Sequence, residues 1–83
     1  MLNVSVISPE RVVFEGTAES VVAPAFDGEV GILPHHAPMM TLLGKGELRL
    51  SGVAEGSGRF RVEGGFLQVL NDSVRVITER AEG

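Results

Sequence analysis

Short apolar runs separated by turn residues are the feature that most limits how this chain can fold. Glycine, proline, asparagine and aspartate break the chain roughly every 6–12 residues, a spacing typical of short antiparallel strands. Between the breaks, apolar and polar residues alternate, as in Leu2–Ile7 and Arg59–Glu63, which gathers the apolar side chains of each run on one face. No segment shows a convincing helical period of about 3.6 residues. The sequence therefore predicts an all-β fold with about nine or ten strands in a two-sheet β-sandwich.

The turn residues also predict where the strands begin and end. Gly16 is expected to end the second strand, Asp27-Gly28 to form a tight turn, and Gly64-Gly65 to mark a bulge or sharp bend. A further turn is expected at Asn71-Asp72-Ser73. The expected strands are residues 2–7, 11–15, 17–23, 30–33, 39–43, 47–51, 59–63, 66–70 and 74–78.

The composition indicates that residues 1–83 form one small globular domain. Apolar residues make up 43% of the chain and charged residues 22%, with a net charge of −4. This acidic balance argues against a nucleic-acid partner, because binding to phosphates needs clustered Lys and Arg. The absence of cysteine excludes disulfides and thiol chemistry. No apolar run approaches the roughly 18–20 residues of a membrane span and no secretory signal is recognisable, so direct membrane insertion is not expected.

Residues 28–43, GEVGILPHHAPMMTLL, form the most irregular stretch of the chain. Gly28 and Gly31 permit backbone conformations closed to other residues. Pro34 and Pro38 fix their own φ and favour extended geometry in the residue before each. We therefore expect a short strand, an extended loop and a second strand. A loop specified this tightly is more often a binding surface than a simple connector.

The two histidines of this loop do not predict a metal site. His35 and His36 are adjacent, and adjacent side chains on extended backbone point to opposite sides. No zinc-type ligand spacing accompanies them. We expect one histidine to pack or hydrogen-bond within the loop and the other to lie on the surface, and we expect no metal or other cofactor.

Other chemical sites are not indicated either. Asp27 and Glu29, on either side of Gly28, are typical of a solvated acidic loop tip, because a catalytic pair needs a cleft and two opposed environments. Such a tip suits recognition of a basic loop on a partner. The glycines form no nucleotide-binding turn, and neither Ser51 nor Ser57 stands in a nucleophile elbow. No catalytic residue, nucleotide site or small-molecule substrate is expected.

Four arginines are expected to share one solvated sheet face, paired with Glu47 and Glu63. No Trp or Tyr interleaves with them, which argues against a groove for single-stranded nucleic acid. The four are Arg49, Arg59, Arg61 and Arg75.

The residues alone favour an interaction module. Two arrangements remain open for Met39 and Met40: both pack in the core, or one is exposed, where methionine makes an adaptable contact surface. The alternative function is a free-standing β-sandwich that binds a small molecule or sugar, which requires a concave apolar pocket with convergent polar groups. All four aromatic residues are Phe, so the Trp and Tyr rings that stack on sugars are missing.

Three segments resemble one protein family. The chain contains VISPERVVFEG at 6–16, then GEVGILPHHAP followed by MMTLL at 28–43, then EGGFLQVLNDSVRVITERA at 63–81. In this order they resemble the epsilon subunit of F-type ATP synthases, called delta in mitochondria. The resemblance implies a ten-stranded β-sandwich without catalytic activity, at the foot of the rotor's central stalk. It implies docking on the gamma subunit and the c-ring, coupling of transmembrane ion flow to ATP synthesis, and a peripheral place on the cytoplasmic face of a bacterial inner membrane or its organelle equivalent.

The resemblance also implies roles for individual residues. The turn Asp27, Gly28 and Glu29 falls at the family's ring-contacting loop, with Glu29 the first choice for the contact. Gly64 and Gly65 match a structural glycine pair. The expected contacts with the gamma subunit are Ser8, His36, Ala37, Pro38 and Met40.

The chain departs from the family pattern in three respects. The turn Gly44-Lys45-Gly46 is a variant of the family's usual form. His35 replaces the glycine more usual before His-Ala-Pro, which predicts a stiffer loop. The sequence ends at Gly83, so we expect this chain to lack the helical hairpin that typically follows the sandwich in the family. We therefore expect neither nucleotide binding nor helical inhibition from this chain.

Overall fold

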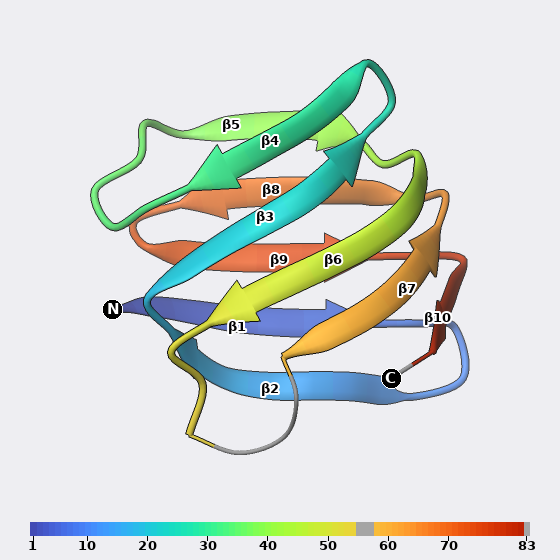
Figure 1. Ribbon diagram of the computed structural model, residues 1–83, viewed down its shortest axis with the longest axis horizontal. Helices are drawn as coiled ribbons and strands as arrows, with labels where there is room; N and C mark the ends of the chain where they lie inside the picture. The colour runs from blue at the N-terminus through green and yellow to red at the C-terminus, as the bar shows by residue number, and fades with distance from the viewer. Residues whose placement is uncertain (55–57, 83) are drawn as a thin grey trace.

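Ten strands form two five-stranded sheets that face each other (Figure 1). The computed structural model describes residues 1–54 and 58–82, so Ser57 lies outside the described residues. The first sheet has the strand order β2 (Val12–Ala18), β1 (Leu2–Ile7), β9 (Ser73–Ile77), β8 (Phe66–Leu70) and β5 (Met39–Leu42). The second sheet has the order β10 (Arg80–Glu82), β7 (Arg59–Glu63), β6 (Lys45–Ser51), β3 (Ser20–Ala25) and β4 (Gly28–Ile32).

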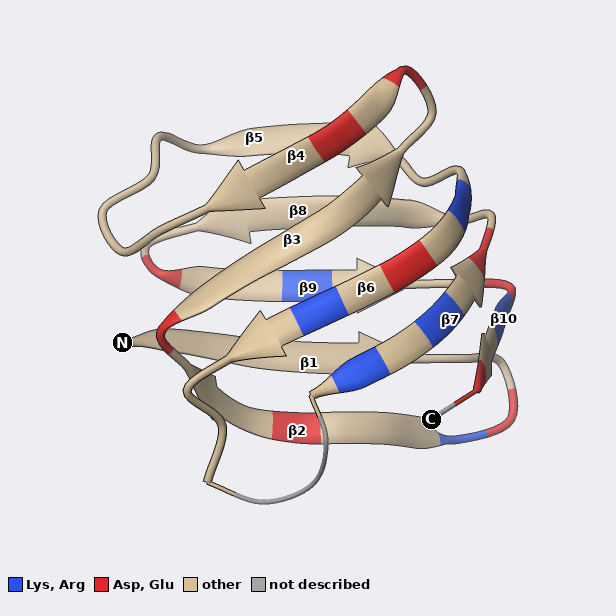
Figure 2. Cartoon of the chain, viewed as in Figure 1, with Lys and Arg blue, Asp and Glu red and all other residues tan. Residues whose placement is uncertain are grey.

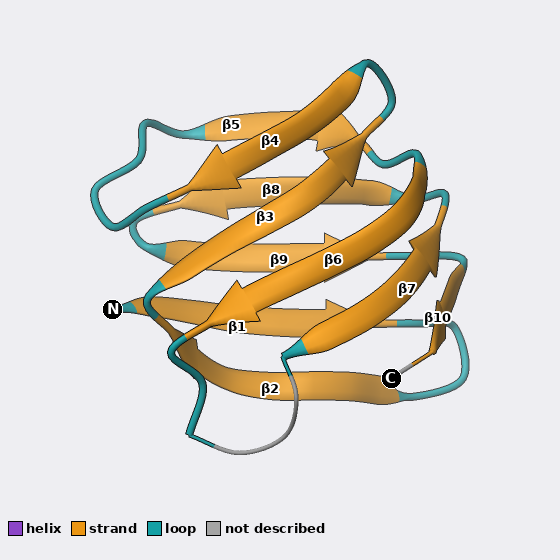
Figure 3. Ribbon diagram, viewed as in Figure 1, coloured by secondary structure: helices purple, strands orange, loops and turns teal. Residues whose placement is uncertain are grey.

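The prediction of an all-β, two-sheet sandwich is confirmed. Only strands, turns and loops occur in the described part of the chain (Figure 3). Neighbouring strands are antiparallel except β1 and β9, which are parallel. β7 and β8 have the expected boundaries.

The expected end of the second strand was wrong. β2 continues through Gly16 to Ala18, because Gly16 pairs with Val4 and the ladder to β1 extends to Ala18. The chain then breaks at Glu19, so the expected strand at 17–23 divides between β2 and β3. β10 was not expected; it is a three-residue edge strand that pairs with β7.

The core lies between the two sheets and consists of the apolar side chains on the inward face of each sheet. Leu2, Val4 and Val6 of β1 are buried, as their alternation with polar residues predicts. A tilted ring pair, Phe14 and Phe60 with centroids 5.7 Å apart, closes one side of the core. The buried apolar residues are Leu2, Val4, Val6, Ala18, Val21, Ala23, Ile32, Leu43, Leu48, Leu50, Val62, Leu67, Val69, Val74 and Val76.

The predicted bend at Gly64 and Gly65 joins the two sheets. Both residues have positive φ, 72° and 99°. The Leu43 N–H donates to the Gly65 carbonyl at 2.9 Å, and the Gly64 N–H donates to the Gly44 carbonyl at 3.3 Å. The bend is therefore hydrogen-bonded to Leu43 and Gly44, the residues where the chain passes from β5 to β6.

Candidate interaction surfaces

The β3–β4 hairpin carries the acidic turn predicted to contact a ring. Ala25 pairs with Gly28, so the two central turn residues are Phe26 and Asp27 rather than Asp27 and Gly28. Gly28 follows with a φ of 131°, a conformation that favours glycine. Asp27, Gly28 and Glu29 are all exposed, but only Asp27 lies at the centre of the turn.

Glu29 belongs to the sheet rather than to the tip. It pairs with Pro24 of β3, and its carboxylate oxygens lie 3.2 and 3.1 Å from Nη2 of Arg49 on β6. Arg49 pairs with Val22, so the ion pair spans β3. Both side chains are largely exposed, 61% for Glu29 and 45% for Arg49, so the pair stabilises the fold only weakly.

The histidine loop connects β4 to β5 and is fastened to the β8–β9 turn. The backbone N–H of His35 donates to Oδ1 of Asp72 at 2.6 Å, and the exposed imidazole reaches Oδ2 of the same carboxylate only at 4.0 Å. His36 is half-buried, with its Nδ1 2.7 Å from the Ala37 carbonyl oxygen. This agrees with one histidine within the loop and one on the surface. Ala37 and Pro38 are exposed beside it.

The outer face of the first sheet carries an apolar row that sequence reasoning missed. Leu42 pairs with Phe66, Phe66 with Ile77, Ile77 with Ile7, and Ile7 with Val12. Residues directly opposite each other share a face of the sheet. The row therefore crosses all five strands, and we call it the outer row. Leu42, Phe66 and Val12 are exposed.

Two further apolar side chains extend this face. Met40 is 64% exposed and pairs with Gln68, whereas Met39 is partly buried and packs against the core. Leu70, at the far end of β8, is also exposed. β8, with the sequence FLQVL, carries apolar residues on both faces. Leu67 and Val69 are buried, and Phe66 and Leu70 point outward.

The residues predicted to contact the gamma subunit do not form one cluster. Ser8 lies in the β1–β2 turn, where its Oγ donates to the Arg11 carbonyl, and the histidine loop lies at the opposite end of the first sheet (Figure 1). Met40 and the outer row occupy the sheet face between these two ends.

The strands of the second sheet carry more charged residues than those of the first (Figure 2). Arg61 lies opposite Glu47 on one side and Glu82 on the other, and Glu63 lies between Lys45 and Arg80. Opposite charges facing each other across strands make this a balanced, solvated surface. The arrangement confirms that Glu47 and Glu63 accompany the arginines of this sheet. Placing Arg75 with them was wrong: it is on β9 of the first sheet, because β9 pairs with β1 and β8.

The described residues can be compared with what a metal site or a small-molecule site requires. No group of three or more His, Asp or Glu side chains in 1–54 and 58–82 is placed to hold a metal ion. An apolar hollow of about 360 Å³ is lined by Met40, Thr41, Leu42 and Phe66, and no set of polar groups converges on it. This hollow therefore does not have the convergent polar groups that the alternative function requires.

The fold and these surfaces define an all-β sandwich domain with an exposed apolar face on one sheet and a charged face on the other. Residues 1–83 match the family described as ATP synthase, Delta/Epsilon chain, beta-sandwich domain. The chain belongs to this family, as its three sequence segments predicted.

Curated relatives agree with this family. The chain is 40% identical over 81 residues to the ATP synthase epsilon chain of Brevibacillus brevis, covering 98% of this chain and 61% of that one. It is 46% identical over 82 residues to the epsilon chain of Dehalococcoides mccartyi, covering 98% and 57%. The chain thus spans about three-fifths of the length of these relatives. Both relatives are named ATP synthase epsilon chains.

Solved structures support the fold. A chain in the central stalk and c-ring structure of Tetrahymena thermophila mitochondrial ATP synthase superposes with a TM-score of 0.81 at 18% identity, covering 98% of this chain and 65% of that one. A chain of the Euglena gracilis mitochondrial enzyme gives 0.80 at 20% identity, covering 98% and 52%. In the described residues, no helix is long and apolar enough to cross a membrane.

Proposed function

We propose that this chain is a non-catalytic rotor domain of an F-type ATP synthase. It docks on the gamma subunit of the central stalk and on the membrane c-ring, and thereby fixes the stalk to the ring. This connection couples ion flow across the membrane to ATP synthesis. The domain is peripheral, on the cytoplasmic face of a bacterial inner membrane or the equivalent face of an organelle membrane.

The observation that carries the proposal is the exposed apolar outer row on the first sheet. Scattered exposed apolar residues are ordinary, but a row across five strands, extended by Met40 and Leu70, is typical of a protein interface. We assign this face to the gamma subunit, since it connects Ser8 at one end with His36, Ala37 and Pro38 at the other. Arg75, exposed near the middle of the face, suits a carboxylate on the partner.

The ring contact is assigned to the acidic turn of Asp27, Gly28 and Glu29. The tip of the β3–β4 hairpin projects past the edge strand β5 (Figure 1), so it can reach a second partner while the outer face of the first sheet is covered. Its negative charge is complementary to a basic loop.

The proposal is tested by retention of purified gamma subunit and c-ring on tagged chain. The wild type is compared with His36→Ala, which should weaken gamma binding, and with Glu29→Arg, which should lose ring contact alone because it opposes a basic loop with a cation. Failure of the wild type to retain gamma at about micromolar concentration, roughly −8 kcal/mol of binding, would contradict the proposal and favour a free-standing ligand-binding sandwich.

A further inference from the structure

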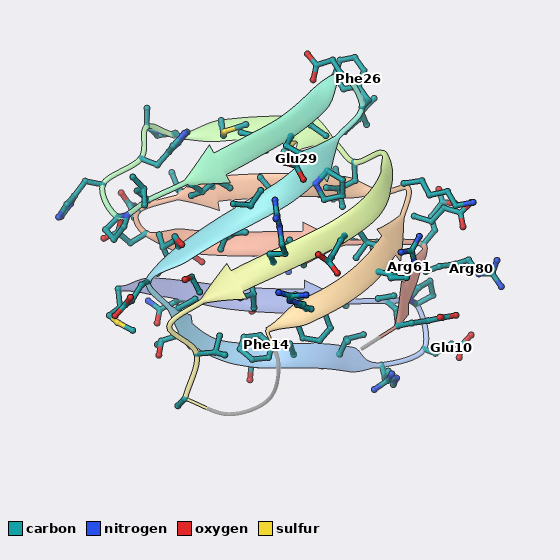
Figure 4. The ribbon with its side chains drawn as sticks, viewed as in Figure 1. Glu10, Phe14, Phe26, Glu29, Arg61 and Arg80 are labelled. Carbon is teal, nitrogen blue, oxygen red and sulfur yellow. The ribbon has the colours of Figure 1, made fainter. Side chains whose placement is uncertain are left out.

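The most exposed large apolar side chain of the described residues is not on the outer row. It is Phe26, 67% exposed, at the centre of the β3–β4 turn. Figure 4 shows it at the far end of the hairpin, away from the space between the sheets. An exposed phenylalanine at a turn position contributes nothing to the core. A phenylalanine side chain buried in a pocket of a partner protein is, however, a typical interface anchor.

The backbone beneath Phe26 is held from both sides. Its N–H donates to the Leu42 carbonyl at 3.0 Å, and the preceding Ala25 forms a bridge with Leu43. The Gly44 N–H donates to the Pro24 carbonyl at 2.8 Å. A side chain at position 44 would lie 3.5 Å from the Phe26 Cα and 3.1 Å from the Ala25 carbonyl oxygen, so this close approach suits glycine. A tip braced in this way loses little conformational entropy on binding.

The two carboxylates near the tip, those of Asp27 and Glu29, differ in whether they already have an ion-pair partner within the chain. The carboxylate of Glu29 is bound to Arg49. Asp27 is exposed, and within 1–54 and 58–82 its side chain has no hydrogen bond or ion pair. Asp27 can therefore bind a cation of another protein without first breaking an ion pair within this chain, whereas Glu29 cannot.

We propose that Phe26 is the apolar anchor of the ring contact and that Asp27 is its charge partner, with Glu29 supporting the hairpin through Arg49. This inference rests on the proposed function. The matching surface on the ring is a loop that offers a small apolar recess beside an Arg or Lys. An anionic lipid surface is a poorer match, because the free carboxylate and the net charge of −4 would both oppose it.

The test measures binding of the chain–gamma complex to detergent-purified c-ring. Phe26→Ser should weaken ring binding at least about tenfold, as expected for loss of a buried aromatic anchor. Asp27→Asn should weaken binding less and remove most of its dependence on salt. Leu33→Ser is the matched control: Leu33 is 63% exposed, beyond the opposite end of β4, and its substitution should leave ring binding unchanged.

The possible failures are distinguishable. Ring binding by Phe26→Ser equal to that of the wild type would overturn the anchor while leaving the proposed function intact. A wild-type complex that retains gamma but not the ring would overturn the ring contact itself, and the anchor with it. Binding of the wild type to anionic vesicles, lost in Phe26→Ser, would assign the tip to lipid and overturn the inference. Retention of gamma by every variant shows that each is folded.

Discussion

The backbone N–H of His35 donates to Oδ1 of Asp72 at 2.6 Å and thereby joins the β4–β5 loop to the β8–β9 turn. Asp72 itself has a φ of 60°, as the second of two turn residues after Asn71 at 50°. Positive φ at both central residues is the two-residue hairpin geometry that Asn and Asp tolerate. The acceptor is therefore placed by a turn that is already rigid.

We predict that Asp72→Gly releases the histidine loop and Asp72→Asn does not. Both residues tolerate positive φ, but only Asn keeps an oxygen that accepts the His35 N–H. Amide hydrogen exchange at His35 should become faster in Asp72→Gly, and binding of the gamma subunit should weaken with it. Equal exchange in the two variants would show that the carboxylate does not hold the loop.

We predict that His35→Gly does not destabilise the domain, unlike most substitutions by glycine. Its φ of 69° is costly for a non-glycine residue, by about 1–2 kcal/mol. His35→Gly relieves this strain and keeps the backbone N–H that Asp72 accepts, while it adds freedom to the unfolded chain. We expect the free energy of unfolding to be unchanged or higher by up to about 1 kcal/mol in urea titrations. His36→Gly, at an ordinary φ, should lower it; a loss of stability in both variants would contradict the strain at position 35.

Local alternation was enough to predict the strands whose two faces differ. Leu2–Ile7 and Arg59–Glu63 each place apolar residues on one face, and both were found as expected. Gly16 was misplaced because its pairing with Val4 extends the strand regardless of glycine's low strand propensity. Arg75 was misplaced because membership of a sheet depends on which strands pair, and local sequence does not contain that information.

The candidate surfaces divide in the same way. The acidic turn and the histidine loop were found from local signals of glycine, proline and charge. The outer row was missed because Leu42, Phe66 and Val12 come from segments far apart in the chain and meet only through strand pairing. Phe26 had a local signal, because it is an apolar residue immediately before Asp-Gly. This signal was overlooked because Asp27 and Gly28 were expected to be the centre of the turn.

Arg49→Ala should affect binding more than stability. The ion pair with Glu29 is exposed at both ends, so its removal should change the free energy of unfolding by less than about 0.5 kcal/mol. It also removes a positive charge close to the acidic turn, and we expect ring affinity to rise by about two- to fivefold, the equivalent of one exposed pair. Arg61→Ala, on the same face opposite Glu47, is the control and should not change ring affinity. Weaker ring binding by Arg49→Ala would mean that Arg49 itself contacts the ring.

Leu42→Glu should separate docking from folding. Leu42 is 61% exposed, so the substitution should change stability by no more than about 0.5 kcal/mol. On the outer row it would bury a charge against an apolar partner, and gamma binding should fall by at least about tenfold. Ser51→Glu adds the same charge to the outer face of the second sheet and should bind gamma like the wild type. Equal loss in both variants would indicate a general charge effect rather than docking at the outer row.

Gly65→Ala should destabilise the domain far more than Gly31→Ala. A Cβ at position 65 would overlap the Ile77 carbonyl oxygen and lie 2.7 Å from the Thr78 Cα, at a φ of 99°. The backbone must move where the two sheets are joined, and we expect a cost of about 2–4 kcal/mol. At position 31 nothing lies within 4 Å and φ is not positive, so alanine should be neutral or slightly stabilising. Thermal unfolding should therefore show a melting temperature lower by more than about 10 °C for Gly65→Ala alone. A similar melting temperature for both variants would show that the bend at Gly65 adapts to a side chain.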